Sequence, residues 1–168
     1  KSPSFLYGLV AQLRPIIIFP FLPSFLFFSL MVQKKNQPMQ PIKIATAQFE
    51  NRSGDKAYNL SVIDQLSAQA AQNGAQVITF HECCISGYSY ARKLSKTQLL
   101  EEAEFVPDGE SIQCLIEISK KNGIVILAGL FEKDKNGQVY NTYVCVNQER
   151  LLAKYRKLHP FIHPDLSP

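Results

Sequence analysis

The sequence lacks acidic residues in its first 40 positions and lacks net charge in the rest of the chain. Residues 1–40 carry a formal charge of +4, from the only four basic side chains there. Residues 41–168 hold the other 14 basic residues and all 14 acidic ones. A domain that binds nucleic acid needs a basic surface to attract phosphates. The neutral body therefore predicts no nucleic-acid partner.

Paired cysteines are also absent, because none of the four cysteines belongs to a CxxC motif. Cys83 and Cys84 are adjacent, which strains any disulfide between them. Cys114 and Cys145 lie in apolar runs, where cysteine usually acts as a small core residue. We therefore expect free thiols, a reducing compartment and a cytoplasmic protein.

A metal site is not expected either. His81, Cys83 and Cys84 lie close together in the sequence, but zinc usually takes four ligands at wider spacing. Neighbouring residues of an extended chain also point in opposite directions. We expect neither a metal nor a cofactor.

The longest apolar run lies near the start of the chain, at residues 16–32. It is shorter than the ~20 residues that usually cross a bilayer, and it contains Pro20 and Pro23, which disfavour a continuous helix. No A-x-A-like cleavage site follows the run. Residues 1–40 are interpreted as a hydrophobic leader and polar linker, either absent from the mature protein or a membrane anchor through residues 16–32. The separate body is residues 41–168.

In the body, short β-branched and apolar runs alternate with amphipathic segments whose apolar residues recur at three- and four-residue steps. Turn residues such as Asn-Gly separate these segments. The patterns predict an α/β (α+β layered) sandwich without internal repeats. The expected strands are 42–49, 76–80, 124–130, 138–146 and 151–157, and the expected helices are 55–73, 96–105 and 112–122.

Two charged residues at strand ends are the candidate site residues. Reactive groups of such sheets gather beyond the carboxyl ends of the strands. Glu82 follows the strand that ends at residue 80, and Lys157 closes the last strand. A carboxylate among apolar neighbours is poorly solvated, which suits a general base, and a nearby ammonium can hold an oxyanion. The alternatives are a glutamate that caps a helix or pairs with an arginine, and a solvated basic strand end.

Glu132 is a third charged residue that follows a buried strand. We interpret it as structural, a carboxylate that satisfies nearby backbone or a basic side chain.

These pieces together resemble the nitrilase, or carbon–nitrogen hydrolase, superfamily. The resemblance runs from about Ile42 to about Phe161. Its separate fragments are Ala47-Gln48, Phe80 to Tyr88, Gly129-Leu130-Phe131-Glu132, Tyr140-Asn141-Thr142 and Tyr155-Arg156-Lys157-Leu158-His159.

The resemblance implies a four-layer α-β-β-α sandwich, of which residues 41–168 would be the N-terminal part. It also implies hydrolysis of a small amide or nitrile by a Glu-Lys-Cys triad, and a homo-oligomer for the full-length protein. Glu82 matches the general base, and Lys157 matches the lysine that stabilises the tetrahedral intermediate. The cysteine would form a thioester.

Two departures from the family pattern stand out. His81 replaces the proline that usually precedes the glutamate, and none of the four cysteines matches the nucleophile, which lies downstream of the lysine. The chain alone is therefore expected to be inactive. The alternative function is a non-catalytic, nitrilase-like domain used for assembly or small-molecule binding.

Overall fold

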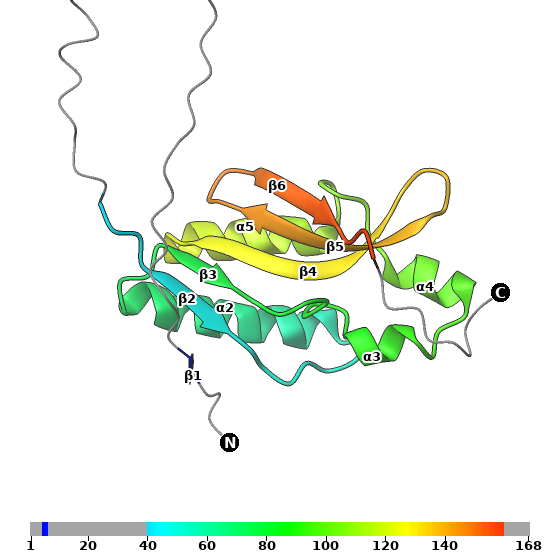
Figure 1. Ribbon diagram of the computed structural model, residues 1–168, viewed down its shortest axis with the longest axis horizontal. Helices are drawn as coiled ribbons and strands as arrows, with labels where there is room; N and C mark the ends of the chain where they lie inside the picture. The colour runs from blue at the N-terminus through cyan, green and yellow to red at the C-terminus, as the bar shows by residue number, and fades with distance from the viewer. Residues whose placement is uncertain (1–4, 7–39, 160–168) are drawn as a thin grey trace, which may run out of the picture.

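The computed structural model describes residues 5–6 and 40–159 of the chain. The run at 16–32 lies outside these residues, so the interpretation of residues 1–40 as a leader stays a prediction. The described residues form one six-stranded sheet in the order β1-β2-β3-β4-β5-β6 (Figure 1). The strands are β1 (Phe5–Leu6), β2 (Ile44–Ala47), β3 (Val77–Thr79), β4 (Val125–Lys133), β5 (Val139–Val146) and β6 (Leu151–Arg156).

The connections explain the strand directions. Strands β2, β3 and β4 are parallel, because the segments that join them contain helices which cross back over the sheet. Strands β4, β5 and β6 are antiparallel and follow one another through short turns. The first of these turns is closed by a backbone hydrogen bond of 3.0 Å from Asp134 N to Gln138 O.

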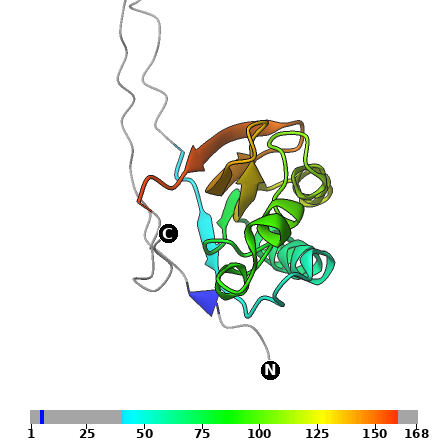
Figure 2. The same ribbon diagram turned by 90° about the vertical axis from the view of Figure 1, so that its right-hand side faces the viewer.

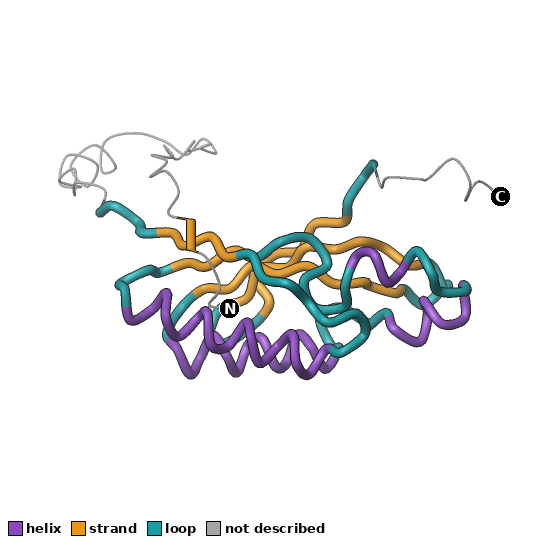
Figure 3. The backbone as a smooth tube through the Cα atoms, turned by 90° about the horizontal axis from the view of Figure 1, so that it is seen from below, coloured by secondary structure: helices purple, strands orange, loops and turns teal. Residues whose placement is uncertain are grey.

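Helices α2 and α5 lie on one face of the sheet, and the short helices α3 and α4 lie at one end of it (Figures 1, 2 and 3). Within the described residues, none of them has the length and apolar character that a membrane crossing requires. The cap residues follow the expected chemistry, since the Asp55 side chain accepts from Tyr58 N at the start of α2 and left-handed Gly123 ends α5. The helices are α2 (Lys56–Gln72), α3 (Tyr88–Ala91), α4 (Lys96–Glu102) and α5 (Glu110–Asn122).

The core fills the space between the sheet and helices α2 and α5. Ile63 of α2, Ile112 of α5 and Ile126 of β4 have no exposed surface. Full burial of such a side chain contributes about 1.5–3 kcal/mol, so these contacts hold the two layers together.

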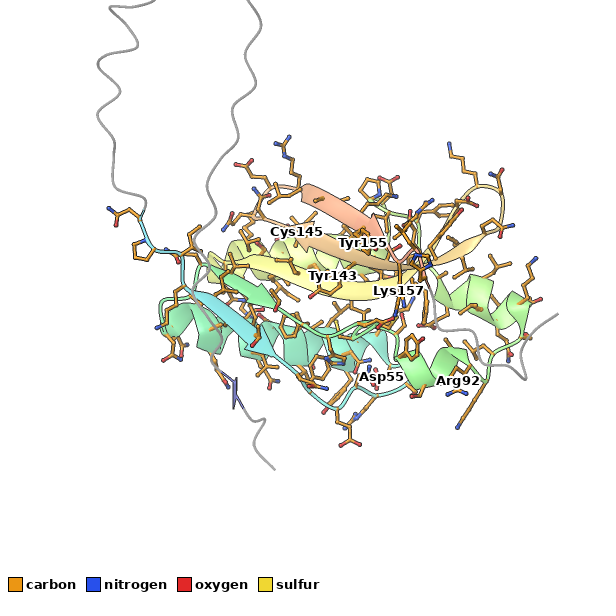
Figure 4. All side chains as sticks on the ribbon, viewed as in Figure 1. Asp55, Arg92, Tyr143, Cys145, Tyr155 and Lys157 are labelled. Carbon is orange, nitrogen blue, oxygen red and sulfur yellow. The ribbon has the colours of Figure 1, made fainter. Side chains whose placement is uncertain are left out.

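The opposite face of the sheet has no helix over it among the described residues. Register pairs Leu127 with Cys145 and Cys145 with Ala153, and it pairs Gly129 with Tyr143 and Tyr143 with Tyr155. These six residues define what we call the open face, on which Figure 4 labels three of them. Tyr155 is 59% exposed, which is high for an aromatic residue on a strand.

The predicted order of five strands and three helices is confirmed, but β1, which pairs with β2, was not predicted, β2 is shorter than the predicted 42–49, and other elements differ as follows. The loop predicted after residue 80 contains the short helix α3, and β4 runs on to Lys133. Helix α4 ends at Glu102 rather than 105, because Glu104 leaves it to pair with β4. There Glu104 N donates to Phe131 O, and Lys133 N donates to Glu104 O. Strand β6 ends at Arg156, one residue before its predicted end.

Candidate functional site

The two candidate residues meet at one end of the sheet. Lys157 Nζ donates to Glu82 Oε1 over 2.7 Å, although 75 positions separate these residues in the chain. Glu82 lies in the loop after β3. Lys157, which Figure 4 labels, is the first residue after β6. The main-chain N–H of Lys157 donates to Asn141 O at 2.8 Å, which continues the β5–β6 pairing as far as the lysine. The end of β6 therefore holds the ammonium against the carboxylate.

The pair is accessible to solvent in this structure. The side chains of Glu82 and Lys157 are 44% and 34% exposed. The expectation that Glu82 is poorly solvated is therefore wrong for the described residues, because no layer covers the open face beside it. The hydrogen bond to Glu82 raises the pKa of Lys157, so its ammonium persists to a higher pH than that of an ordinary lysine.

A glycine in β4 sets the path of the loop that carries Glu82. A β-carbon on residue 129 would lie 2.4 Å from Cys83 N and 3.2 Å from Glu82 Cα. The loop is also bonded to this glycine, because Ile85 N donates to Gly129 O and Gly129 N donates to Cys84 Sγ. Only a residue without a side chain allows the loop to rest on β4, and this contact places Glu82.

None of the four cysteines has the environment of an activated thiol. Burial, followed by the charge of Glu82, raises the pKa of Cys83 to about 12. Burial likewise raises the pKa of Cys84 to about 12 and raises the pKa values of Cys114 and Cys145. A nucleophilic cysteine needs a lowered pKa. All four are free thiols, and within residues 5–6 and 40–159 no cluster of His, Cys, Asp or Glu could hold a metal.

Glu132 lies on the other face of the sheet, where it is 1% exposed. Arg156 binds both of its oxygens, with Nη2 at 2.6 Å from Oε1 and Nε at 3.0 Å from Oε2. Thr142 Oγ1 donates to Oε2 at 2.8 Å, and Lys154 Nζ donates to Oε1. Burial alone would raise the pKa of Glu132, but these hydrogen bonds outweigh burial and lower it to about 2. Glu132 thus has the structural role that was expected.

Adjacent residues of β5, and adjacent residues at the end of β6, bind the two different glutamates. Neighbouring residues on a strand point to opposite faces. On β5, Thr142 donates to Glu132 and the adjacent Asn141 donates to Glu82. At the end of β6, Arg156 pairs with Glu132 and the adjacent Lys157 pairs with Glu82. The buried cluster on the helix face therefore shares its two strands with the pair of Lys157 and Glu82.

Replacing Glu132 by glutamine is expected to reduce the free energy of unfolding by about 3 kcal/mol at pH 7, because it leaves two cations without a buried counterion. The folded-state pKa of Glu132 is depressed, so its stabilisation is complete above the unfolded value of about 4.3 and is lost as pH falls toward about 2. Urea unfolding at pH 7 and pH 2.5 measures this difference.

The control is Glu149→Gln, in the exposed turn before β6. It should leave stability unchanged at both pH values, since no ion pair involves Glu149 in the described residues. A Glu132→Gln deficit that stays the same at both pH values would contradict the assigned cause.

The sequence model for the carbon-nitrogen hydrolases matches residues 43–168. The chain belongs to the carbon–nitrogen hydrolase family. Among curated carbon–nitrogen hydrolases, a nitrilase from Pyrococcus abyssi is 30% identical over 71% of this chain and 44% of its own length. An omega-amidase from Xenopus laevis is 35% identical over 73% of this chain and 42% of its own length. The chain thus spans less than half the length of these relatives.

Solved structures of this family share the fold. An amidase of the nitrilase superfamily, from Nesterenkonia sp. AN1, superposes with a TM-score of 0.58 and 24% identity. The match covers 73% of this chain and 45% of that one. The fold class expected from the sequence is therefore confirmed. The described residues supply one helix layer and one sheet layer of the expected four-layer arrangement.

Three residues at the site escaped the sequence analysis as site residues. Asn141 Nδ2 donates to Glu82 Oε1 at 2.5 Å, Gly129 supports the Glu82 loop, and the ring of Tyr88 lies 5.9 Å from Lys157 Nζ. Each of the three belongs to a fragment that carries the family resemblance. That membership was the signal in the sequence that could have identified them as site residues. His81, in place of the usual proline, packs edge-on against Phe49 at 5.1 Å.

Proposed function

We propose that this chain supplies the general base and the oxyanion-binding lysine of a hydrolase that cleaves the carbon–nitrogen bond of a small amide. The observation that carries the proposal is the 2.7 Å contact between Lys157 Nζ and Glu82 Oε1 at the ends of two different strands. The nucleophile is a cysteine in sequence beyond residue 168, because the four thiols of this chain have raised pKa values. The chain by itself is inactive.

The reaction follows from the chemistry of the pair. Glu82 takes the proton of the cysteine thiol, and the thiolate attacks the amide carbon to form a carbon–sulfur bond. The Lys157 ammonium stabilises the oxyanion of the tetrahedral intermediate. When the carbon–nitrogen bond breaks, protonated Glu82 returns its proton to the departing ammonia and leaves a thioester. Water then attacks the thioester with Glu82 as base, which releases the acid and the thiol.

The omega-amidases and the amidase from Nesterenkonia sp. AN1 favour an amide through their names, whereas the relative from Pyrococcus abyssi is named a nitrilase. An amide is therefore the first substrate to test. A further half of the domain would cover the open face and remove Glu82 and Lys157 from water. This cover supplies the desolvation that a general base uses, which the described residues lack. The homo-oligomer implied by the resemblance stays a prediction.

The test uses the complete protein, expressed from a reading frame extended past residue 168. The enzyme is mixed with short aliphatic amides and with the corresponding nitriles, and released ammonia is measured. Ammonia should form from amides faster than from nitriles. Mass spectrometry of the quenched enzyme should find an acyl group on a cysteine outside residues 1–168. An acyl group on Cys83, Cys84, Cys114 or Cys145 would contradict the proposal.

A second candidate is a non-catalytic domain for assembly or small-molecule binding. One observation favours it, namely that the described residues contain no activated thiol beside Glu82. This candidate predicts that the complete protein releases no ammonia from any amide and carries no acyl group after incubation. The ammonia assay therefore separates the two functions.

A further inference from the structure

Asn141 touches both members of the candidate pair. Its side-chain Nδ2 donates to Glu82 Oε1 at 2.5 Å, and its main-chain oxygen accepts from Lys157 N at 2.8 Å. It lies in β5, opposite Phe131 of β4, and alternation directs it to the same side as Tyr143. One residue of a central strand therefore reaches both groups.

The hydrogen bonds to the Glu82 carboxylate are unequal. Asn141 Nδ2 and Lys157 Nζ both donate to Oε1, at 2.5 Å and 2.7 Å. In the described part of the chain, no side chain or main-chain group donates to Oε2. Two donors on one oxygen fix the rotation of the carboxylate about its last side-chain bond. Negative charge on Oε1 is satisfied by the protein, and Oε2 keeps its lone pairs for another partner.

The main-chain contact positions the lysine. Strand β6 ends at Arg156, and the hydrogen bond from Lys157 N to Asn141 O extends the pairing by one residue. Without this bond the lysine would begin a free loop. With it, the direction of the Lys157 side chain is set by β5, and Asn141 holds the carboxylate to which that side chain points.

We infer that Asn141 is a positioning residue of the hydrolase, which holds Glu82 through Oε1 so that Oε2 is the oxygen that exchanges protons. The inference rests on the proposed function. In the acylation step the sulfur–hydrogen bond breaks, its proton forms a bond to Oε2, and the sulfur lone pair attacks the amide carbon. Oε1 stays bonded to Asn141 and Lys157 throughout. Asn141 itself touches no reacting atom and acts through Glu82.

The first experiment measures the carboxylate directly and requires no turnover. The 168-residue chain is labelled with ¹³C at the glutamate side-chain carboxyl, and the Glu82 signal is recorded at pH 7. In Asn141→Ala, the chemical shift of this signal is expected to change, because the carboxylate loses a donor to Oε1. Asn141→Asp should change it further, since a like charge replaces the donor.

Tyr143→Phe is the matched control. Tyr143 lies two residues farther along β5 on the same face, and its hydroxyl donates to Phe80 O at 2.5 Å. Its loss should lower the melting temperature without moving the Glu82 carboxyl signal, because Tyr143 does not touch the carboxylate. The inference is overturned when Asn141→Ala leaves this signal where it is in the wild type, or when Tyr143→Phe shifts it equally.

The second experiment is kinetic and uses the complete hydrolase. Asn141→Ala is expected to reduce kcat for a short amide up to about 100-fold with little change in KM, because the base is misplaced while the substrate still binds. The acid limb of the pH–rate profile should also move. A merely structural residue would lower the amount of folded enzyme and leave the limb in place.

The two experiments separate the inference from the proposed function. A wild-type protein that hydrolyses no amide refutes the function, while the Glu82 carboxyl signal still decides whether Asn141 positions Glu82. An active enzyme whose Asn141→Ala variant keeps its kcat and its acid limb refutes the inference and leaves the function standing.

Discussion

Glu82→Gln is expected to reduce kcat/KM of the complete hydrolase for a short amide by about 10²–10⁴-fold, the range that general base catalysis contributes. Glutamine keeps the shape of the side chain and can still accept from Asn141 and Lys157. It cannot take a proton from a thiol. The cysteine should therefore stay a thiol at neutral pH, and its alkylation by iodoacetamide should slow together with turnover.

Lys157→Met is expected to reduce kcat by about 10²–10³-fold, as the loss of one oxyanion donor does. Methionine retains much of the lysine chain length and removes the charge. Both substitutions act on the same transition state. The double variant should therefore lose little more activity than the less active of the two single variants. Additive losses would contradict a shared transition state.

The kinetic losses should occur without a loss of folding. Glu82 and Lys157 are well exposed in the described residues, and exposed ion pairs contribute only about 0–1 kcal/mol. The melting temperature of the 168-residue chain should therefore hardly change in either variant. Lys154→Met is the matched lysine control, since Lys154 lies in β6, three residues before Lys157, but pairs with Glu132. It should lower stability and leave the chemical step intact.

The alkaline side of the pH profile gives a further check on Lys157. Its folded-state pKa is raised by Glu82, so the ammonium is present below the ordinary lysine value of about 10.4 and is lost only as pH rises through the higher folded value. An activity loss that begins below about pH 10 must then come from another group. If the fall in activity at high pH comes from deprotonation of Lys157, the Lys157→Met variant should no longer show it.

The sequence predicted the elements of the fold where local pattern decides them. Short apolar runs became β3 and β4, and three- and four-residue steps became α2 and α5. The end of α4 could not be predicted, because Glu104 leaves the helix to bond β4 through Phe131 and Lys133. That bond joins residues nearly 30 positions apart, and no helix propensity reports it.

The site was predictable in part for the same reason. Glu82 and Lys157 stand at strand ends, and strand ends can be read from periodicity. Asn141 could not be chosen, because its contact with Glu82 depends on how β5 pairs with β4 and on the path of the loop that carries Glu82. The Glu132 partners Thr142 and Arg156 lie beside Asn141 and Lys157 in the sequence. In each adjacent pair, one residue thus binds Glu82 on one face of the sheet and the other binds Glu132 on the opposite face. This relation is visible only once the strands are paired.

Gly129→Ala is expected to reduce the free energy of unfolding of the 168-residue chain by about 2–3 kcal/mol, the upper part of the range for overpacking. The added β-carbon would lie 2.4 Å from Cys83 N, a main-chain atom that no rotamer change can move away. Either the Glu82 loop lifts from β4 or β4 bends. For a domain of this size, the loss corresponds to a melting temperature lower by roughly 10 °C.

The same substitution should remove the site geometry, because the loop that must lift is the one that carries Glu82. The contact between Glu82 and Lys157 spans one hydrogen bond of 2.7 Å, so a shift of about 1 Å breaks it and costs about 100-fold in rate. Gly74→Ala is the control, since residue 74 has a positive φ of 78° and open space around it. It should cost about 1 kcal/mol through backbone strain alone and leave turnover unchanged. Equal losses of activity in the two variants would show that backbone strain, not the close approach to Cys83, controls the position of Glu82.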